Sequence, residues 1–151
     1  MNYFTDKIAA FDYSLATQEA FDNCQVFVFR KNKKDSAEFY VVLKTDCLNN
    51  EILTEVEKWF EAYVTEEFLH KHAPSYLYMT SVACVEKVSP TFYSLVSAYT
   101  HKKISIFNLH TGISFGGKTV YISDVMEGPT NPKVLVMRKM FTEIIKDFNE
   151  I

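Results

Sequence analysis

The chain has 151 residues, enough for one compact domain and too few for two ordinary ones. Hydrophobic residues make up 48% of it and charged residues 23%, which excludes general disorder, while four glycines and four prolines exclude collagen-like and linker-like architectures. The net charge of −3 argues against a dedicated nucleic-acid binder, whose domain normally carries a basic field.

The first predicted element is an amphipathic helix near the start of the chain. Phe4, Ile8, Phe11 and Leu15 recur at i, i+4, i+7 and i+11, so they share one helical face. The polar pair at 22–23 interrupts this pattern and marks the end of the segment.

A β-hairpin is predicted next. Residues 24–31 and 37–44 are rich in Val, Phe and Tyr, and the polar residues 32–36 lie between them. The basic run 30–34 would contact phosphate or an acidic partner if it were functional. It contains no aromatic residue on which a base would stack, so the sequence favours an ordinary solvated hairpin tip.

A second helix is predicted from an N-cap at Asn49 or Asn50 to about Leu69. Its glutamates Glu51, Glu55 and Glu61 are expected to face away from the core. The predicted core face consists of Ile52, Val56, Trp59, Phe60 and Tyr63, widened by Leu53 and Val64.

The following segments alternate between strand and helix patterns. Residues 76–87 read as a long strand, and Ser89-Pro90 is typical of a helix start. Residues 92–99 carry a short helical stripe, after which residues 103–110 return to a strand pattern.

A second hairpin is predicted around the glycine pair at 116–117. Residues 113–115 and 118–125 are β-rich, and a tight turn between them needs the positive φ angles that glycine tolerates. Gly112, within the first arm, suggests a bulge or a bend.

The last predicted helix opens at Asn131-Pro132. Leu135 and Val136 fall outside its core face, and Met140 falls at the edge of that face. We therefore expect these three residues to form an interaction surface, with a second core layer as the alternative. The predicted core face consists of Val134, Met137, Phe141, Ile144, Ile145 and Phe148.

These elements predict the order α-β-β-α-β-α-β-β-α. The expected fold is α+β, with a mixed or antiparallel sheet of about five strands flanked by helices. Because no linker or repeat interrupts the pattern, residues 1–151 are expected to form a single globular domain.

One segment matches a phosphate-binding motif. Residues 112–119 fit G-x-x-x-x-G-K-[ST], with Gly112, Gly117, Lys118 and Thr119 at the defining positions. A P-loop requires a strand before the glycines and a helix after them, so that backbone N–H groups face the phosphates. The residues after Thr119 are β-rich instead, so the hairpin is the favoured interpretation and the P-loop the alternative.

No residue stands out as catalytic or metal-binding. His70-Lys71-His72 is the one close histidine pair, and it lacks both i, i+4 spacing and a third ligand at a known spacing. Neither Glu38 with Lys44 nor Glu86 with Lys87 has the E-x-K spacing of a nuclease strand. We therefore predict no catalytic residues, no metal and no cofactor.

The expected location is the cytoplasm. The first residues lack the basic and apolar regions of a secretory signal, and the longest apolar runs are far below the roughly 20 residues of a membrane helix. Cys24, Cys47 and Cys84 form no CxxC motif, so they are expected to be reduced thiols, mostly buried.

Two classes of function remain. Nine tyrosines are difficult to bury, because each hydroxyl needs a partner, and tyrosine is enriched at protein interfaces. The favoured prediction is a non-catalytic interaction subunit: an adaptor, a regulatory partner or a building block of an assembly. Its partner would be another protein or a second copy of the chain, with no nucleic acid and no membrane. The alternative is a small-molecule or nucleotide-binding protein, possibly an enzyme, that uses residues 112–119.

Overall fold

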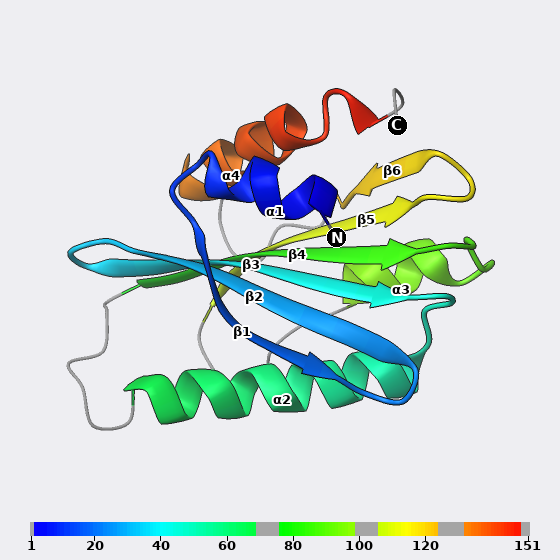
Figure 1. Cartoon of the computed structure of the whole chain (residues 1–151), viewed down its shortest axis with the longest axis horizontal. Coiled ribbons are helices and arrows are strands. Elements are labelled where there is room, and N and C mark those ends of the chain that lie inside the picture. Colours follow the sequence, from blue (N-terminus) through cyan, green and yellow to red (C-terminus); the bar gives the residue numbers. More distant parts are fainter. Residues whose placement is uncertain (1, 69–75, 99–105, 124–131, 149–151) are drawn as a thin grey trace.

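The computed structural model describes residues 2–68, 76–98, 106–123 and 132–148. They form one six-stranded mixed sheet with helices on both faces (Figure 1). The α+β class is confirmed, and the expected number of strands is corrected from about five to six. The elements in chain order are α1 (Asn2–Ala9), β1 (Ser14–Ala20), β2 (Cys24–Asn32), β3 (Ser36–Thr45), α2 (Asn50–Phe68), β4 (Tyr76–Val85), α3 (Phe92–Ala98), β5 (Phe107–Ser114), β6 (Thr119–Ile122) and α4 (Pro132–Ile144).

The strands lie in the sheet in the same order as in the chain. β1, β2 and β3 form an antiparallel meander, β3, β4 and β5 run parallel, and β6 returns antiparallel to β5. Parallel neighbours need a crossover connection, and α2 and α3 lie within the two that are required here. Val85 is level with both Thr45 and Ser114, so the three parallel strands end along the same edge of the sheet.

The helices form two layers (Figure 1). α2 and α3 cover one face, where Phe39 of β3 meets Phe60 of α2 edge to face with ring centroids 5.4 Å apart. α1 and α4 cover the other face, where Tyr40 of β3 and Phe141 of α4 belong to a second buried cluster. β3 is therefore buried on both faces, because its successive side chains enter different cores.

The first predicted helix is shorter than its apolar pattern suggested. α1 ends at Ala9, and Asp12 takes a left-handed φ of 70° before the chain enters β1. Ile8 is fully buried, but Leu15 belongs to the edge strand β1 and its side chain is 49% exposed. β1 was missed because its residues, SLATQEA, have little β propensity and no apolar alternation. Pairing with β2 makes this segment a strand.

The second helix agrees with its prediction except at one residue. The Asn49 side chain caps α2, because its Oδ1 accepts a hydrogen bond of 2.9 Å from the N–H of Ile52. The helix is described to Phe68, close to the expected end at Leu69. Glu61, expected to face away from the core, is only 7% exposed.

Gly112 and Gly116 are required because a side chain would not fit there, and neither glycine has a positive φ. Residues 115–118 form a four-residue turn, and Lys118 has the left-handed φ of 51° that was expected of a glycine. A Cβ on Gly116 would lie 2.4 Å from the carbonyl oxygen of Glu86, and a Cβ on Gly112 would lie 2.6 Å from the ring of Phe92. The bulge expected at Gly112 is absent, because its register with β4 and β6 is continuous.

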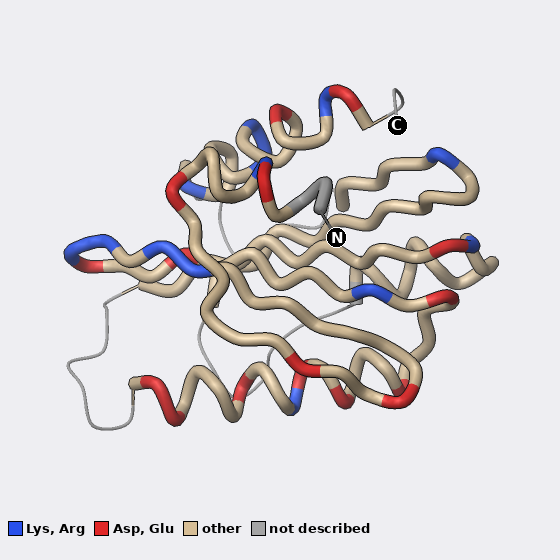
Figure 2. Tube along the Cα trace, viewed as in Figure 1, with Lys and Arg blue, Asp and Glu red and all other residues tan. Residues whose placement is uncertain are grey.

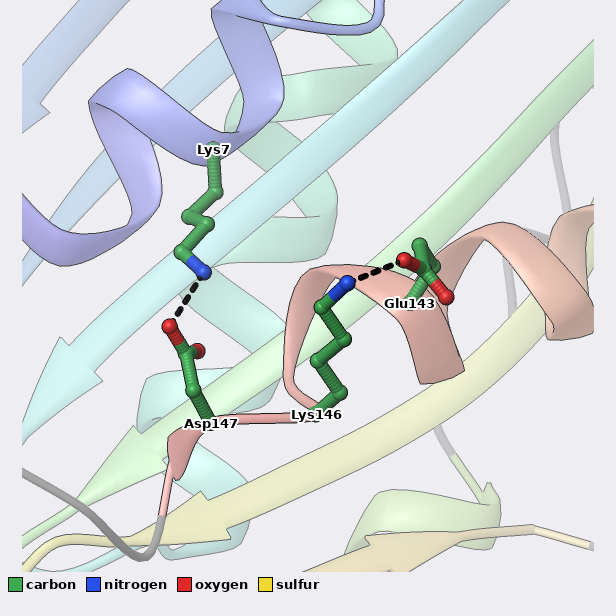
Figure 3. A network of polar contacts seen from close by, with 4 residues as sticks. All are labelled: Lys7, Glu143, Lys146 and Asp147. Atoms are coloured by element: carbon green, nitrogen blue, oxygen red, sulfur yellow. Dashed lines mark hydrogen bonds and ion pairs between the residues drawn. The ribbon is translucent and has the colours of Figure 1, made fainter.

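An ion pair joins the first helix to the residues that follow the last one (Figure 3). The Lys7 ammonium of α1 lies 2.6 Å from Oδ2 of Asp147, and both side chains are about one-third exposed. Next to it, the exposed Lys146 pairs with Glu143 of α4 at 2.6 Å. Exposed pairs of this kind contribute little to stability, so the packing of the second core holds α1 in place.

Gly116→Ala should destabilise the protein by about 1–3 kcal/mol, because its new methyl group would collide with a backbone oxygen that cannot rotate away. Urea unfolding measures the effect. Gly117→Ala is the matched control, since its Cβ would meet the rotatable Ser114 hydroxyl at 3.1 Å, and it should cost less than about 1 kcal/mol. Equal losses in the two variants would contradict this account.

Candidate functional site

The three residues proposed as an interaction surface do not behave alike. Leu135 is 45% exposed and Val136 is 49% exposed, so both lie on the outer face of α4. Met140 is only partly exposed and packs against the second core. The surface that the structure offers is therefore Leu135 and Val136, which we call the α4 apolar pair.

The α4 apolar pair is unusual because α4 already has a complete inner face. Val134, Met137, Phe141 and Ile144 are each no more than 4% exposed and pack on the sheet. The outer face of α2 provides the comparison. The exposed residues of α2 include no large hydrophobic side chain: Asn50, Glu51, Thr54, Glu55, Lys58, Ala62, Thr65 and Glu66. The same sheet thus carries one helix with a polar outer face and one with an apolar pair on it.

The residues of the P-loop alternative lie in a β-hairpin. Gly112 is within β5, Gly117 and Lys118 are in the turn, and Thr119 begins β6. The Lys118 ammonium lies 5.8 Å from the ring centroid of Phe148. Because no helix follows the glycines here, this segment does not present the helix N-terminus on which P-loop binding depends.

Part of the basic run 30–34 is used inside the fold. Arg30 pairs with Glu67 of α2 at 3.0 Å, and its guanidinium lies 4.8 Å from the ring centroid of Phe68. Lys31 donates a hydrogen bond to the carbonyl oxygen of Phe11 at 3.1 Å. The expectation of a fully solvated tip therefore holds for Lys34, whereas Lys33 is exposed but also pairs with a buried carboxylate.

A buried carboxylate is the most concentrated polar centre among the described residues, and sequence reasoning missed it. Glu38 of β3 is only 2% exposed. Its Oε2 accepts a hydrogen bond of 3.0 Å from the Tyr13 hydroxyl. Its Oε1 pairs with Lys33 at 3.2 Å and with Lys133 of α4. These four residues, which we call the Glu38 centre, come from four separate parts of the chain.

The electrostatics of the Glu38 centre favour a structural link over catalysis. Burial opposes the charged form of Glu38, but hydrogen bonds from Lys133, Tyr13 and Lys33 together hold its pKa below the ordinary value. Burial, reinforced by the Glu38 charge, raises the pKa of Tyr13. A carboxylate that already accepts from three donors is a weak base, so the centre is suited to holding segments together.

The two Glu–Lys pairs that the sequence analysis compared with a nuclease strand lie on β3 and just after β4. Glu38 and Lys44 lie at opposite ends of β3, about 20 Å apart along the strand. Glu86 and Lys87 follow the end of β4, and the Glu86 carbonyl accepts a hydrogen bond of 3.1 Å from Gly116.

An open pocket of about 600 Å³ lies where β3 and β4 end, beside the first turn of α2. Crevices at the carboxyl ends of parallel strands are common ligand sites. Asp22, Asp46 and Glu86 contribute three carboxylates to its lining, and Lys44 contributes one ammonium. Phe115 is the one residue of the predicted phosphate-binding segment that lines it.

All three cysteines line this pocket as free thiols. Cys24 and Cys84 are buried and Cys47 is exposed. Burial raises the pKa of Cys84 to about 12, and burial with the nearby Glu55 charge raises that of Cys24. Because the thiolate is the reactive form, a raised pKa makes these two thiols less reactive than an ordinary cysteine.

Comparison of the chain with protein families, curated proteins and solved structures finds no match.

Across the described residues, no helix is long and apolar enough to cross a membrane. The same part of the chain contains no cluster of three or more His, Cys, Asp or Glu side chains arranged to hold a metal. Several residues of the sequence predictions lie outside the described part of the chain: His70-Lys71-His72, Tyr99, residues 103–105 and 124–125 of the predicted strands, and Asn131.

Glu38→Gln should lower the free energy of unfolding by about 3 kcal/mol, because it removes the buried negative charge that pairs with the Lys133 and Lys33 ammonium groups. Chemical denaturation at pH 7 measures the change. Glu143→Gln makes the same chemical change at the exposed pair with Lys146, and should have no measurable effect.

The cost of Glu38→Gln should also depend on pH. Since folding lowers the pKa of Glu38, its charge stabilises the fold fully above the unfolded-state pKa of about 4.3. That contribution is lost as the pH falls through the lower folded-state pKa. The stability gap between the wild type and the variant should therefore narrow below about pH 4. A gap of the same size at pH 7 and pH 3 would refute the assignment.

Proposed function

We propose that this protein is a non-catalytic interaction subunit that binds a protein partner through the outer face of α4. The observation that carries the proposal is the α4 apolar pair. Leu135 and Val136 are nearly half exposed on a helix whose opposite face is fully packed. Exposed apolar groups that are not needed for the core are typical of protein interfaces.

Two further features support this proposal over catalysis. The Glu38 carboxylate is already bound by Tyr13, Lys33 and Lys133, and the buried thiols have raised pKa values. Neither group has the properties of a base or a nucleophile at neutral pH. The role we propose is that of an adaptor, regulatory partner or assembly component in the cytoplasm, where thiols remain reduced.

The variant Leu135→Gln/Val136→Gln should abolish recovery of the partner in affinity purification from native cells. Glutamine is about as good a helix former as leucine and a better one than valine, and it replaces apolar surface by a polar amide, so the free energy of unfolding should change by less than about 1 kcal/mol. Mass spectrometry of the recovered complexes measures the loss. Leu15→Gln is the control, because Leu15 is equally exposed at 49% but lies on β1.

Retention of the partner by the double variant would show that the α4 apolar pair is not the interface. A protein that recovers no partner at all, and that remains monomeric at high concentration, would exclude the proposed function itself.

Binding of a small molecule is a second candidate function, favoured by the pocket at the ends of β3 and β4. Its volume of about 600 Å³ suits a ligand of nucleotide size. Charged and amide side chains line it, including Asp46, Glu86, Lys44 and Asn49. The hairpin at 112–119 contributes only Phe115, so any such ligand would be held by the sheet edge and not by a P-loop.

Under this second candidate, a thermal-shift screen of nucleotides and polar metabolites should raise the unfolding midpoint, because a ligand that binds only the native state stabilises it. Cys47→Trp should suppress the rise, since the larger side chain would fill part of the pocket from an exposed position. No rise with any compound would remove this candidate.

A further inference from the structure

We propose that the partner of the α4 apolar pair presents an acidic protein segment with apolar anchor residues. This inference rests on the proposed function and names the chemistry of its partner. The observation that carries it is the charge around Leu135 and Val136. These residues have basic neighbours, although the net charge of the chain is negative.

The first half of α4 is basic. Between Pro132 and Met140 it carries Lys133, Arg138 and Lys139 and no acidic residue. Helices favour acidic side chains in the first turn, where the helix dipole is positive, and α4 has none there. Lys139 is three residues from Val136 and four from Leu135, so it shares their outer face. It is exposed and forms no recorded ion pair within the described part of the chain.

The β2–β3 turn adds positive charge beside the start of α4. Lys33 and Lys133 both pair with Oε1 of Glu38, so the turn and the helix meet at one buried oxygen. The two lysine ammonium groups and the single Glu38 carboxylate together have a net charge of about +1. Lys34 is exposed at the same tip, next to Asp35, and forms no recorded ion pair among the described residues. Figure 2 shows this tip in blue, projecting from the same side of the molecule on which α4 begins.

The opposite helical layer has the reverse charge. α2 carries six glutamates and one lysine, and red segments recur along this helix at the lower edge of Figure 2. The two helices are therefore opposite in charge across the sheet: α2 is acidic, and α4, whose one acidic residue is Glu143, is basic. A symmetric pairing of two α4 faces would place like charges opposite each other, which disfavours a second copy in that arrangement.

A protein segment fits this surface better than a membrane or a nucleic acid. An interfacial membrane helix commits its whole apolar face to lipid, whereas the apolar face of α4 is buried on the sheet. Single-stranded nucleic acid needs aromatic side chains for stacking, and the exposed hydrophobic residues of α4 are aliphatic. Two aliphatic side chains bordered by lysines instead match apolar anchors flanked by carboxylates.

The probe is a short labelled helical peptide with leucines along one face and glutamates beside them, compared with the same peptide carrying Gln in place of Glu. Fluorescence anisotropy with the full chain should show the acidic peptide binding at least about tenfold more tightly. Its affinity should fall between about 50 mM and 300 mM salt, because exposed charges are screened. No binding of the acidic peptide at low salt would overturn the inference.

Charge reversal tests the surface itself. Lys34→Glu/Lys139→Glu should weaken binding of the acidic peptide by at least about tenfold. Lys58→Glu/Lys87→Glu makes the same change in net charge at exposed lysines elsewhere and should have little effect. Equal losses in both variants, or tighter binding to anionic vesicles or to an oligonucleotide, would overturn the inference.

The inference and the proposed function fail in different ways. A cellular partner that is lost with Leu135→Gln/Val136→Gln but is insensitive to Lys34→Glu/Lys139→Glu would refute an acidic partner and leave the interaction role intact. A partner that depends on both pairs of residues supports both. Recovery that is independent of Leu135 and Val136 refutes the interface on which the inference rests.

Discussion

Taking a carboxylate out of water costs free energy unless positive charge and hydrogen-bond donors surround it, and Glu38 meets this requirement with groups from three other segments. Tyr13 precedes β1, Lys33 lies in the β2–β3 turn and Lys133 lies in the first turn of α4. The positions of these segments are therefore not independent. Because Lys133 lies in the first turn of α4, the same link ties the start of this helix to β3.

Regular segments with strong periodicity were predictable from the sequence. The Val- and Phe-rich strands β2 and β3, the capped helix α2 and the core face of α4 all follow local patterns. β1 does not, since its residues favour neither strand nor burial and only pairing with β2 defines it. The glycines at 112 and 116 were recognised as special, but the reason for them is contact with Phe92 and Glu86, which are distant in sequence.

The candidate sites also differ in how far the sequence could predict them. The outward position of Leu135 and Val136 follows from helical periodicity, so sequence was sufficient to select them. The Glu38 centre brings together positions 13, 33, 38 and 133, and no local spacing connects them. The one available signal was an acidic residue at an inward position of a buried strand, and it is weak without knowledge of which face is covered. The sequence likewise contains the acidic residues of α2 and the basic residues of α4, but it does not show that these two helices lie on opposite faces of the sheet.

The parallel pairing of β3 with β4 has a consequence for synthesis of the chain. The β1–β2–β3 meander is built from neighbouring segments, so it can pair as soon as it leaves the ribosome. The far edge of β3 then stays open until the α2 crossover and Tyr76–Val85 have also emerged. During that interval the nascent polypeptide displays a long apolar ladder able to pair with another chain. Translation speed through the α2 region therefore sets how long each newly made molecule is exposed to aggregation.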